Sequence, residues 1–279
     1  MDKKTLKKQN FLDFVVYRIF SSKYNKDFVL EGSKSIDIKT KNKLANKGVI
    51  YYRLPKDLDL NLKFRESKIK DIENILKDIF KNDLDIKVET SIVENIETNK
   101  FFFKVKRIQD EQTASNLEVD IILDTDQYTI EEENFFYNKE VIKVQTYNIE
   151  KYVANKIISL RKVYKENKHF LLHEKINLDN FKTKDEISVF IDLFWFVSHF
   201  LIDKKELLRN LELMYDETIF NIKLENYISY LNDLLNDDEF VINISLIMDN
   251  MKILRREMFK TFLRGTFKGI LKEKNGQSS

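Results

Sequence analysis

The apolar residues of this chain change their spacing near residue 146. Before that point, stretches of helical spacing alternate with short runs in which every second residue is apolar, a mixture typical of combined α and β structure. After it, apolar residues recur at helical spacing almost throughout. We therefore predict an α+β fold, with a mixed sheet in a domain of residues 1–146 and an all-helical domain of residues 147–279.

The same spacing predicts where the individual elements lie. In the first domain we expect helices at 5–21, 33–45 and 68–80, and strands at 28–30, 49–52, 58–64, 85–93, 101–108, 117–123 and 141–145. In the second domain we expect helices at 149–165, 184–202, 204–214, 222–235 and 251–271. A lysine-rich loop is expected before Gly48, and it carries Lys39, Lys41, Lys43 and Lys47.

Composition excludes several classes of protein. The 279 residues are 43% hydrophobic and 34% charged, which is typical of a soluble globular protein. No run of about 18 apolar residues could span a bilayer, and the basic start lacks the apolar core of a signal peptide. Without cysteine the chain has neither a disulfide nor a thiolate metal site, so we expect a cytoplasmic protein with no membrane partner. The net charge is only +2, so any nucleic-acid surface must come from local clusters of charge.

Two carboxylates at the start of a predicted strand indicate chemistry. Asp57 and Asp59 form a D-x-D, and residues two apart on a strand share a face, so both can bind one hard divalent cation such as Mg²⁺. Upstream, an apolar strand ends in Gly32-Ser33, whose backbone N–H groups can bind phosphate. These parts predict metal-assisted phosphoryl transfer from a nucleotide. The alternatives are an exposed acidic strand start and an ordinary turn with Ser33 as a helix N-cap, and the N-cap is compatible with phosphate binding.

Four motifs in order resemble the AbiEii/AbiGii family of nucleotidyltransferase toxins. They are Gly32-Ser33, the run Arg53-Leu-Pro-Lys-Asp-Leu-Asp-Leu, the lysine-bearing helix of residues 147–156, and Lys182-Thr-Lys-Asp. The chain departs from the family pattern at Pro55, where a Ser is common, and at Lys182, where an Arg is common.

The resemblance implies a fold and an activity. The fold is a polymerase β-like nucleotidyltransferase core followed by helices that frame its cleft. The activity is the Mg²⁺-dependent transfer of a nucleoside monophosphate from an NTP to an acceptor, with the 3′ end of tRNA as the expected acceptor. The biological role is that of a toxin in an abortive-infection or toxin–antitoxin system, checked by a separate antitoxin protein.

The resemblance also implies roles for four further residues. Asp120, an acidic residue within an apolar strand, would be a third carboxylate at the metal, although Glu118 has the same parity and Asp124 is close. Lys156 would neutralise phosphate charge, with a snorkelling surface lysine as the alternative. Lys184 would contact phosphate and Asp185 would be catalytic. The alternative for that segment is a helix-capping box formed by Thr183 and Glu186.

Other features of the sequence leave alternatives open. His169 and His173 are four residues apart, but no third metal ligand is evident, so structural roles are expected for them and for His199. The last helix is basic and amphipathic, which suits RNA, a membrane surface or a solvated stripe; its cations are Lys252, Arg255, Arg256, Lys260, Arg264 and Lys268. Competing functions are nucleotidylation of a protein or small molecule, and a degenerate module that binds nucleotide without transferring it.

Overall fold

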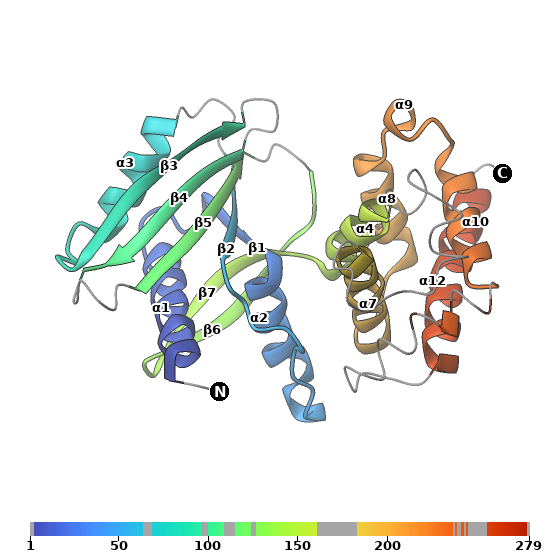
Figure 1. Ribbon diagram of the computed structural model, residues 1–279, viewed down its shortest axis with the longest axis horizontal. Coiled ribbons are helices and arrows are strands. Elements are labelled where there is room, and N and C mark those ends of the chain that lie inside the picture. The colour runs from blue at the N-terminus through green and yellow to red at the C-terminus, as the bar shows by residue number, and fades with distance from the viewer. Residues whose placement is uncertain are drawn as a thin grey trace. The chain divides into compact units, whose positions relative to one another are not determined.

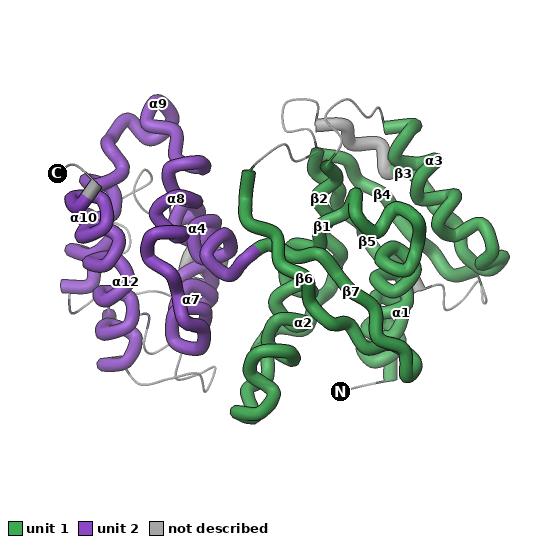
Figure 2. The backbone as a smooth tube through the Cα atoms, turned by 180° about the vertical axis from the view of Figure 1, so that it is seen from behind, with its two compact units in different colours: residues 1–147 green, residues 148–279 purple. Residues whose placement is uncertain are grey.

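The computed structural model is shown in Figure 1. It describes residues 3–63, 69–95, 100–108, 115–123, 127–160, 183–236, 238, 241–242, 244 and 256–277. The chain divides into two compact units, Met1–Tyr147 and Asn148–Ser279, coloured green and purple in Figure 2. No helix among the described residues combines the length and the apolar character needed to cross a bilayer.

Unit 1 is built on a seven-stranded sheet in the order β3-β4-β5-β2-β1-β7-β6. Its strands are β1 (Phe28–Glu31), β2 (Leu58–Leu62), β3 (Ile86–Asn95), β4 (Lys100–Arg107), β5 (Ser115–Leu123), β6 (Ile130–Tyr137) and β7 (Glu140–Tyr147). The pairs β2–β5 and β1–β7 are parallel, and the other four are antiparallel. The mixed sheet that the sequence predicted is therefore confirmed.

Three α-helices accompany this sheet: α1 (Lys3–Phe20), α2 (Gly32–Leu44), which a 3₁₀ turn at Ala45–Lys47 extends, and α3 (Ile69–Phe80). Contacts of α1 with β5 and of α3 with β3 bury the apolar side of the sheet. In β2 the leucines alternate with polar residues, so Leu58, Leu60 and Leu62 enter this core. Asp59 and Asn61 consequently point to the opposite face of the sheet.

Some local expectations were wrong. Residues 49–52 form no strand, and β6 was not predicted. Three lysines assigned to a loop lie on α2 instead; they are Lys39, Lys41 and Lys43. Lys39 is fully buried, with its ammonium 2.6 Å from Glu131 and 3.1 Å from Glu133 of β6. Because an ammonium can be buried only with partners, the acidic strand β6 explains why α2 extends through this lysine-rich segment.

Unit 2 is helical in every element that the structure describes. Its described helices are α4 (Ile149–Ser159), α7 (Thr183–His199), α8 (Lys204–Met214), α9 (Glu217–Phe220), α10 (Leu224–Leu234) and α12 (Arg256–Gln277). Asn148 caps α4 by accepting a hydrogen bond from the Lys151 backbone N–H. Aromatic side chains join α7 to α12, with the Phe194 and Phe259 ring centroids 5.5 Å apart. The prediction of a helical C-terminal region is confirmed.

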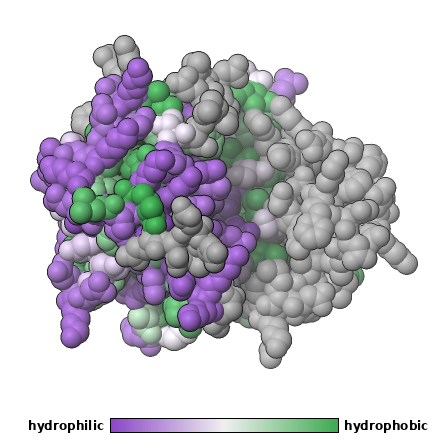
Figure 3. Space-filling view, turned by 60° about the vertical axis from the view of Figure 1, so that its left-hand side comes forward, coloured by the Kyte–Doolittle hydropathy of each residue, from purple (hydrophilic) through white to green (hydrophobic). Residues whose placement is uncertain are grey.

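The surface matches the high charged content of the sequence. On the face shown in Figure 3, hydrophilic residues dominate the described surface and hydrophobic residues form small patches. Large exposed apolar side chains such as Leu84 and Phe136 are scattered over different strands and loops. Scattered apolar residues of this kind are normal on a protein surface and do not by themselves indicate a binding site.

Candidate nucleotide and metal site

Three acidic residues lie in a row across the middle of the sheet. The register places Glu31 of β1 opposite Asp59 of β2, and Asp59 opposite Asp120 of β5. Paired residues on neighbouring strands have their side chains on the same face, about 5 Å apart. Asp57, exposed just before β2, adds a fourth carboxylate to this group. The sheet therefore brings together two predicted metal ligands and a third candidate.

The environment of Asp59 disfavours its charged form. Burial is the largest cause and raises the pKa of its carboxyl from 3.8 to about 7, with further contributions from the negative charges of Asp57, Asp120 and Glu31. The positive charge of Lys100 acts in the opposite direction. A half-buried carboxylate among like charges is a group that a cation would stabilise strongly.

Gly32 is required by the position of Asp59. Its φ of +65° lies in the left-handed region, and a Cβ at this position would be 1.9 Å from Asp59 Oδ2. No side chain could occupy that space without displacing the carboxylate. Gly32 thus allows the backbone at the start of α2 to approach the predicted metal ligand closely.

The start of α2 provides the predicted phosphate-binding groups. Gly32 and Ser33 are the first two residues of this 13-residue helix, and Glu31 at the N-cap makes no side-chain capping hydrogen bond within the described structure. The first N–H groups of a helix lack intrahelical partners and carry partial positive charge. Lys34 does not serve the phosphate site, because its buried ammonium lies 2.6 Å from Asp13 and 3.1 Å from Asp37.

Asp120 is already engaged by a cation of the protein. Lys100 Nζ at the start of β4 lies 2.7 Å from Asp120 Oδ2. Among the described residues, no three His, Cys, Asp or Glu side chains form a group arranged to hold a metal ion. The donor chemistry nevertheless fits Mg²⁺, because carboxylate oxygens surround Asp59 and destabilise its charge. Asp57 and Asp59 would hold the ion.

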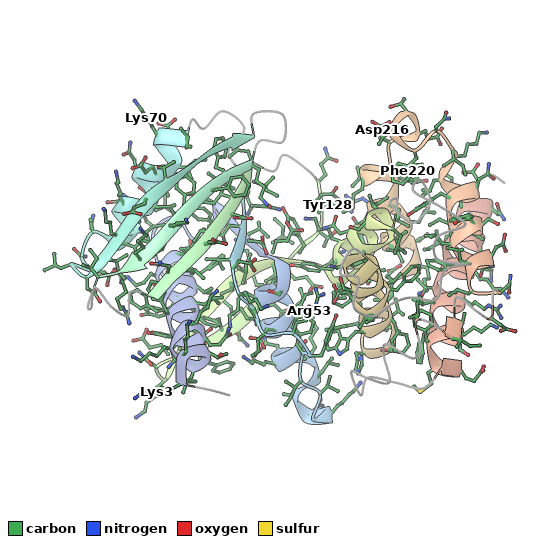
Figure 4. All side chains as sticks on the ribbon, in the orientation of Figure 1. Lys3, Arg53, Lys70, Tyr128, Asp216 and Phe220 are labelled. Atoms are coloured by element: carbon green, nitrogen blue, oxygen red, sulfur yellow. The ribbon has the colours of Figure 1, made fainter. Side chains whose placement is uncertain are left out.

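A polar network supports the row of carboxylates from the side of β7. Asn61 Nδ2 donates to Glu31 Oε2 at 3.0 Å and to the Tyr147 hydroxyl at 2.8 Å. Tyr128, labelled in Figure 4, packs edge-on against Tyr147 with ring centroids 5.7 Å apart. These buried bonds fix Glu31 beside Asp59, which lies opposite it in the register.

Two contacts lie in the loop before Asp57. The Arg53 guanidinium, labelled in Figure 4, lies 5.7 Å from the Tyr52 ring centroid. The carbonyl of Pro55 accepts a hydrogen bond from Gln9 of α1. Pro55, which departs from the family pattern, therefore offers a backbone contact that holds the D-x-D segment against α1.

The remaining predicted site residues belong to unit 2. Lys156 on α4 forms an ion pair with Asp192 on α7, with Nζ 2.8 Å from Oδ2. The Asp192 side chain is 1% exposed and the Lys156 side chain 29%, so the carboxylate is buried and the lysine is partly exposed. Lys184 and Asp185 lie in the first turn of α7, and their side chains are outside the described set.

Several alternatives from the sequence can be placed. His199 stacks on Trp195 at 4.8 Å between ring centroids, and its Nδ1 lies 2.8 Å from the Trp195 carbonyl oxygen, as expected for a structural residue. His169 and His173 lie outside the described residues.

The basic C-terminal helix is α12, and its cations are partly used within unit 2. Lys260 lies 3.5 Å from Asp238, and Arg264 donates to the Leu235 carbonyl at the end of α10 at 3.1 Å. Lys268 is exposed. Two further basic positions, Lys252 and Arg255, lie outside the described residues.

Sequence reasoning missed residues whose importance depends on pairing between distant segments. Glu31 directly precedes Gly32, but only the strand register places it beside Asp59. Lys100 directly precedes a predicted strand, and nothing in the neighbouring sequence indicates its contact with Asp120. Asp192 could have been found, because an acidic residue within the apolar face of a predicted helix requires a partner.

Comparisons with known proteins identify a family and a similar fold. The family model for the nucleotidyl transferase AbiEii toxin of type IV toxin–antitoxin systems matches residues 17–273. Among solved structures, the fold is similar to that of MenT4, a nucleotidyltransferase toxin from Mycobacterium tuberculosis. That match has a TM-score of 0.51 and 12% identity, and it covers 98% of this chain and 87% of the other. No curated protein sequence matches the chain.

Proposed function

Because the chain belongs to the AbiEii family of nucleotidyltransferase toxins from type IV toxin–antitoxin systems, we propose that it transfers a nucleoside monophosphate from an NTP to the 3′ end of tRNA. In this proposal the reaction depends on Mg²⁺ and takes place in the cytoplasm. The observation that carries the proposal is the close approach of Gly32 to Asp59, which places the start of α2 beside a carboxylate. Phosphate-binding N–H groups and a metal ligand are thereby joined in one site.

Each predicted site residue of unit 1 has a proposed role in this reaction. Asp57 and Asp59 hold the magnesium ion, which when bound neutralises charge on the phosphates and polarises the reacting phosphorus. The N–H groups and hydroxyl at Gly32 and Ser33 bind the triphosphate at the start of α2. Asp120 lies on the same face as Asp59 and is the third proposed metal ligand, after Asp57 and Asp59.

The bond changes balance without any further reactant. The 3′ oxygen of the acceptor forms a bond to the α-phosphorus of the NTP, and the bond from that phosphorus to the bridging oxygen breaks. Pyrophosphate leaves, and the hydroxyl proton passes to a carboxylate of the site and then to water. The chain's acidic groups therefore need only orient, accept a proton and hold charge.

Unit 2 supplies two further proposed contributions. Lys156, oriented by Asp192, neutralises phosphate charge, and Lys184 contacts phosphate while Asp185 orients the acceptor or accepts its proton. We also propose that the two compact units are functional domains, a nucleotidyltransferase domain of residues 1–146 and a helical domain of residues 147–279.

The proposal is tested by offering the protein each α-labelled NTP together with RNA, protein or an aminoglycoside. Transfer of label to tRNA is expected, and sequencing of RNA 3′ ends after induced expression should show added nucleotides. Label on protein or drug instead would assign a different acceptor to the same chemistry. Tight NTP binding without transfer to any acceptor would indicate a nucleotide-binding module and contradict the proposal.

A further inference from the structure

The side-chain ammonium of Lys100 lies in the acidic site, although the backbone of Lys100 does not pair with Asp120. In the register of β4 and β5, Lys100 lies opposite Ile122, whereas Phe102 lies opposite Asp120. The lysine side chain therefore runs diagonally by two residues to bring Nζ within 2.7 Å of Asp120 Oδ2. On the way it passes over the Phe102 ring, with Nζ 4.9 Å from the centroid. Two separate contacts thus hold this cation in one position.

The neighbouring carboxylates explain why the Lys100 ammonium lies at this position. The side chains of Glu31, Asp59 and Asp120 follow one another across three neighbouring strands on one face. Like charges at this separation repel one another, and the repulsion is largest where water is partly excluded. Lys100 and Asp120 have 31% and 22% of their side chains exposed, so their pair is partly shielded. The ammonium supplies a positive charge to a row that otherwise has none within it.

Asp120 Oδ2 cannot bind the Lys100 ammonium and a divalent cation equally well at the same time. A divalent ion held by Asp57 and Asp59 would gain a third hard ligand from Asp120, which lies opposite Asp59 in the sheet. That oxygen lies 2.7 Å from the Lys100 ammonium. We propose that Lys100 is the resident counter-ion of the metal-free site and is displaced from Asp120 when the divalent cation binds. This inference rests on the proposed function, because it assumes that the metal binds at Asp57 and Asp59.

If the metal displaces Lys100, removing the lysine charge should lower the stability of the protein in chelator and raise its affinity for the metal. Lys100→Met keeps most of the side-chain length and removes the charge. In chelator the variant should be less thermally stable than the wild-type protein, because the carboxylates lose their counter-ion. Its affinity for Mn²⁺, used as a spectroscopic probe of the site, should be about tenfold tighter, because no ammonium competes for Asp120. Saturating Mn²⁺ should restore the melting temperature to that of the wild-type protein.

Mn²⁺ binding by electron paramagnetic resonance and calorimetry, without nucleotide, is the test. Lys100→Arg keeps the charge and should bind Mn²⁺ within about twofold of the wild-type protein. Lys104→Met is the matched control, since Lys104 is on the same face of β4 but lies opposite Glu118. It removes the same charge farther from Asp120 and should change affinity far less. Lys100→Gln replaces the methionine variant if the latter does not fold.

The outcomes separate this inference from the proposed function. Mn²⁺ binding that is lost in Asp59→Asn but is unchanged or weaker in Lys100→Met would overturn the counter-ion role alone. Weaker binding would make Lys100 a residue that helps to assemble the site. Mn²⁺ binding that does not depend on Asp59 would overturn both the proposed metal site and this inference. Tighter binding in Lys100→Met, together with lower stability in chelator, is the result expected.

Discussion

The Cβ atom of any residue placed at position 32 would lie 1.9 Å from Asp59 Oδ2. This relationship links two motifs that are far apart in the sequence, the glycine that opens α2 and the carboxylate of β2. The antiparallel pairing of β1 with β2 creates it, because Glu31, the residue before Gly32, pairs with Asp59. The close approach requires glycine for two reasons, space and backbone conformation.

Substitution of Gly32 separates those two reasons. Gly32→Ala should lower the free energy of unfolding by roughly 1–2 kcal/mol, because alanine disfavours the left-handed backbone conformation. It should also displace Asp59, so that nucleotide transfer falls by about 100-fold or more. Gly48 is the matched control, since its φ is +67° but a Cβ there would meet nothing within 4 Å. Gly48→Ala should lose similar stability and keep its transfer activity. Equal activity in the two purified variants would show that the contact with Asp59 has no catalytic importance.

The raised pKa of Asp59 predicts an unusual dependence of stability on pH. Between pH 4 and 7 the folded protein retains a proton on Asp59 that the unfolded chain has released, so this group lowers stability as pH rises through that range. Asp59→Asn removes the effect. In chelator the variant should match the wild-type protein near pH 4 and exceed it at pH 8, by no more than about 4 kcal/mol.

Urea unfolding of both proteins at pH 4, 6 and 8 measures this difference. A variant that is less stable than the wild-type protein at pH 8 would mean that the ionised Asp59 carboxylate is well stabilised without a metal. That result would contradict the electrostatic description of the site.

The ion pair in unit 2 predicts unequal effects of removing each partner. Lys156→Met leaves the buried Asp192 carboxylate without this ammonium and should cost about 1–3 kcal/mol. Asp192→Asn leaves a partly exposed lysine that water can solvate, so its cost should be smaller. A double-mutant cycle measured by chemical unfolding gives the coupling between them. Additive effects would indicate that the two side chains do not interact in solution.

A substitution of Asp185 can distinguish a catalytic role from a role in stabilising helix α7. It lies in the first turn of α7, where an acidic residue also stabilises the helix dipole. We expect Asp185→Asn to lower turnover by about 100-fold or more, with a melting temperature close to that of the wild-type protein. A lower melting temperature with unchanged turnover would assign Asp185 to helix stability only.

The fold class followed from local patterns, and the errors arose where distant segments decide the structure. The alternation of leucines with Asp59 and Asn61 predicts a strand whose leucines face the core, as observed, although Asn61 on the other face is buried as well. The lysines of residues 39–43 resemble a solvated loop, but Lys39 is buried by carboxylates from β6, more than ninety residues later. Because β6 is itself rich in glutamate, neither segment shows its structure without the other.

The same reasoning applies to the site. Gly32, Asp57 and Asp59 could be proposed because residue type and spacing alone suggest phosphate and metal binding, and their roles stay predictions. Glu31 and Lys100 could not be assigned, because their significance depends on strand register. Asp192 could have been singled out as an acidic residue in an apolar helix, but its partner depends on helix packing. The proposed roles of Lys184 and Asp185 stay predictions.

The most direct test of the central claim compares nucleotide transfer by the wild-type protein, Asp57→Asn and Asp59→Asn. The measurement is the rate of label transfer from α-labelled NTP to tRNA in Mg²⁺, with circular dichroism as the check of folding. Because the metal contributes several kcal/mol to such a transition state, each variant should be folded and slower by at least about 1,000-fold. A folded Asp59→Asn variant that transfers label at the wild-type rate would contradict the account.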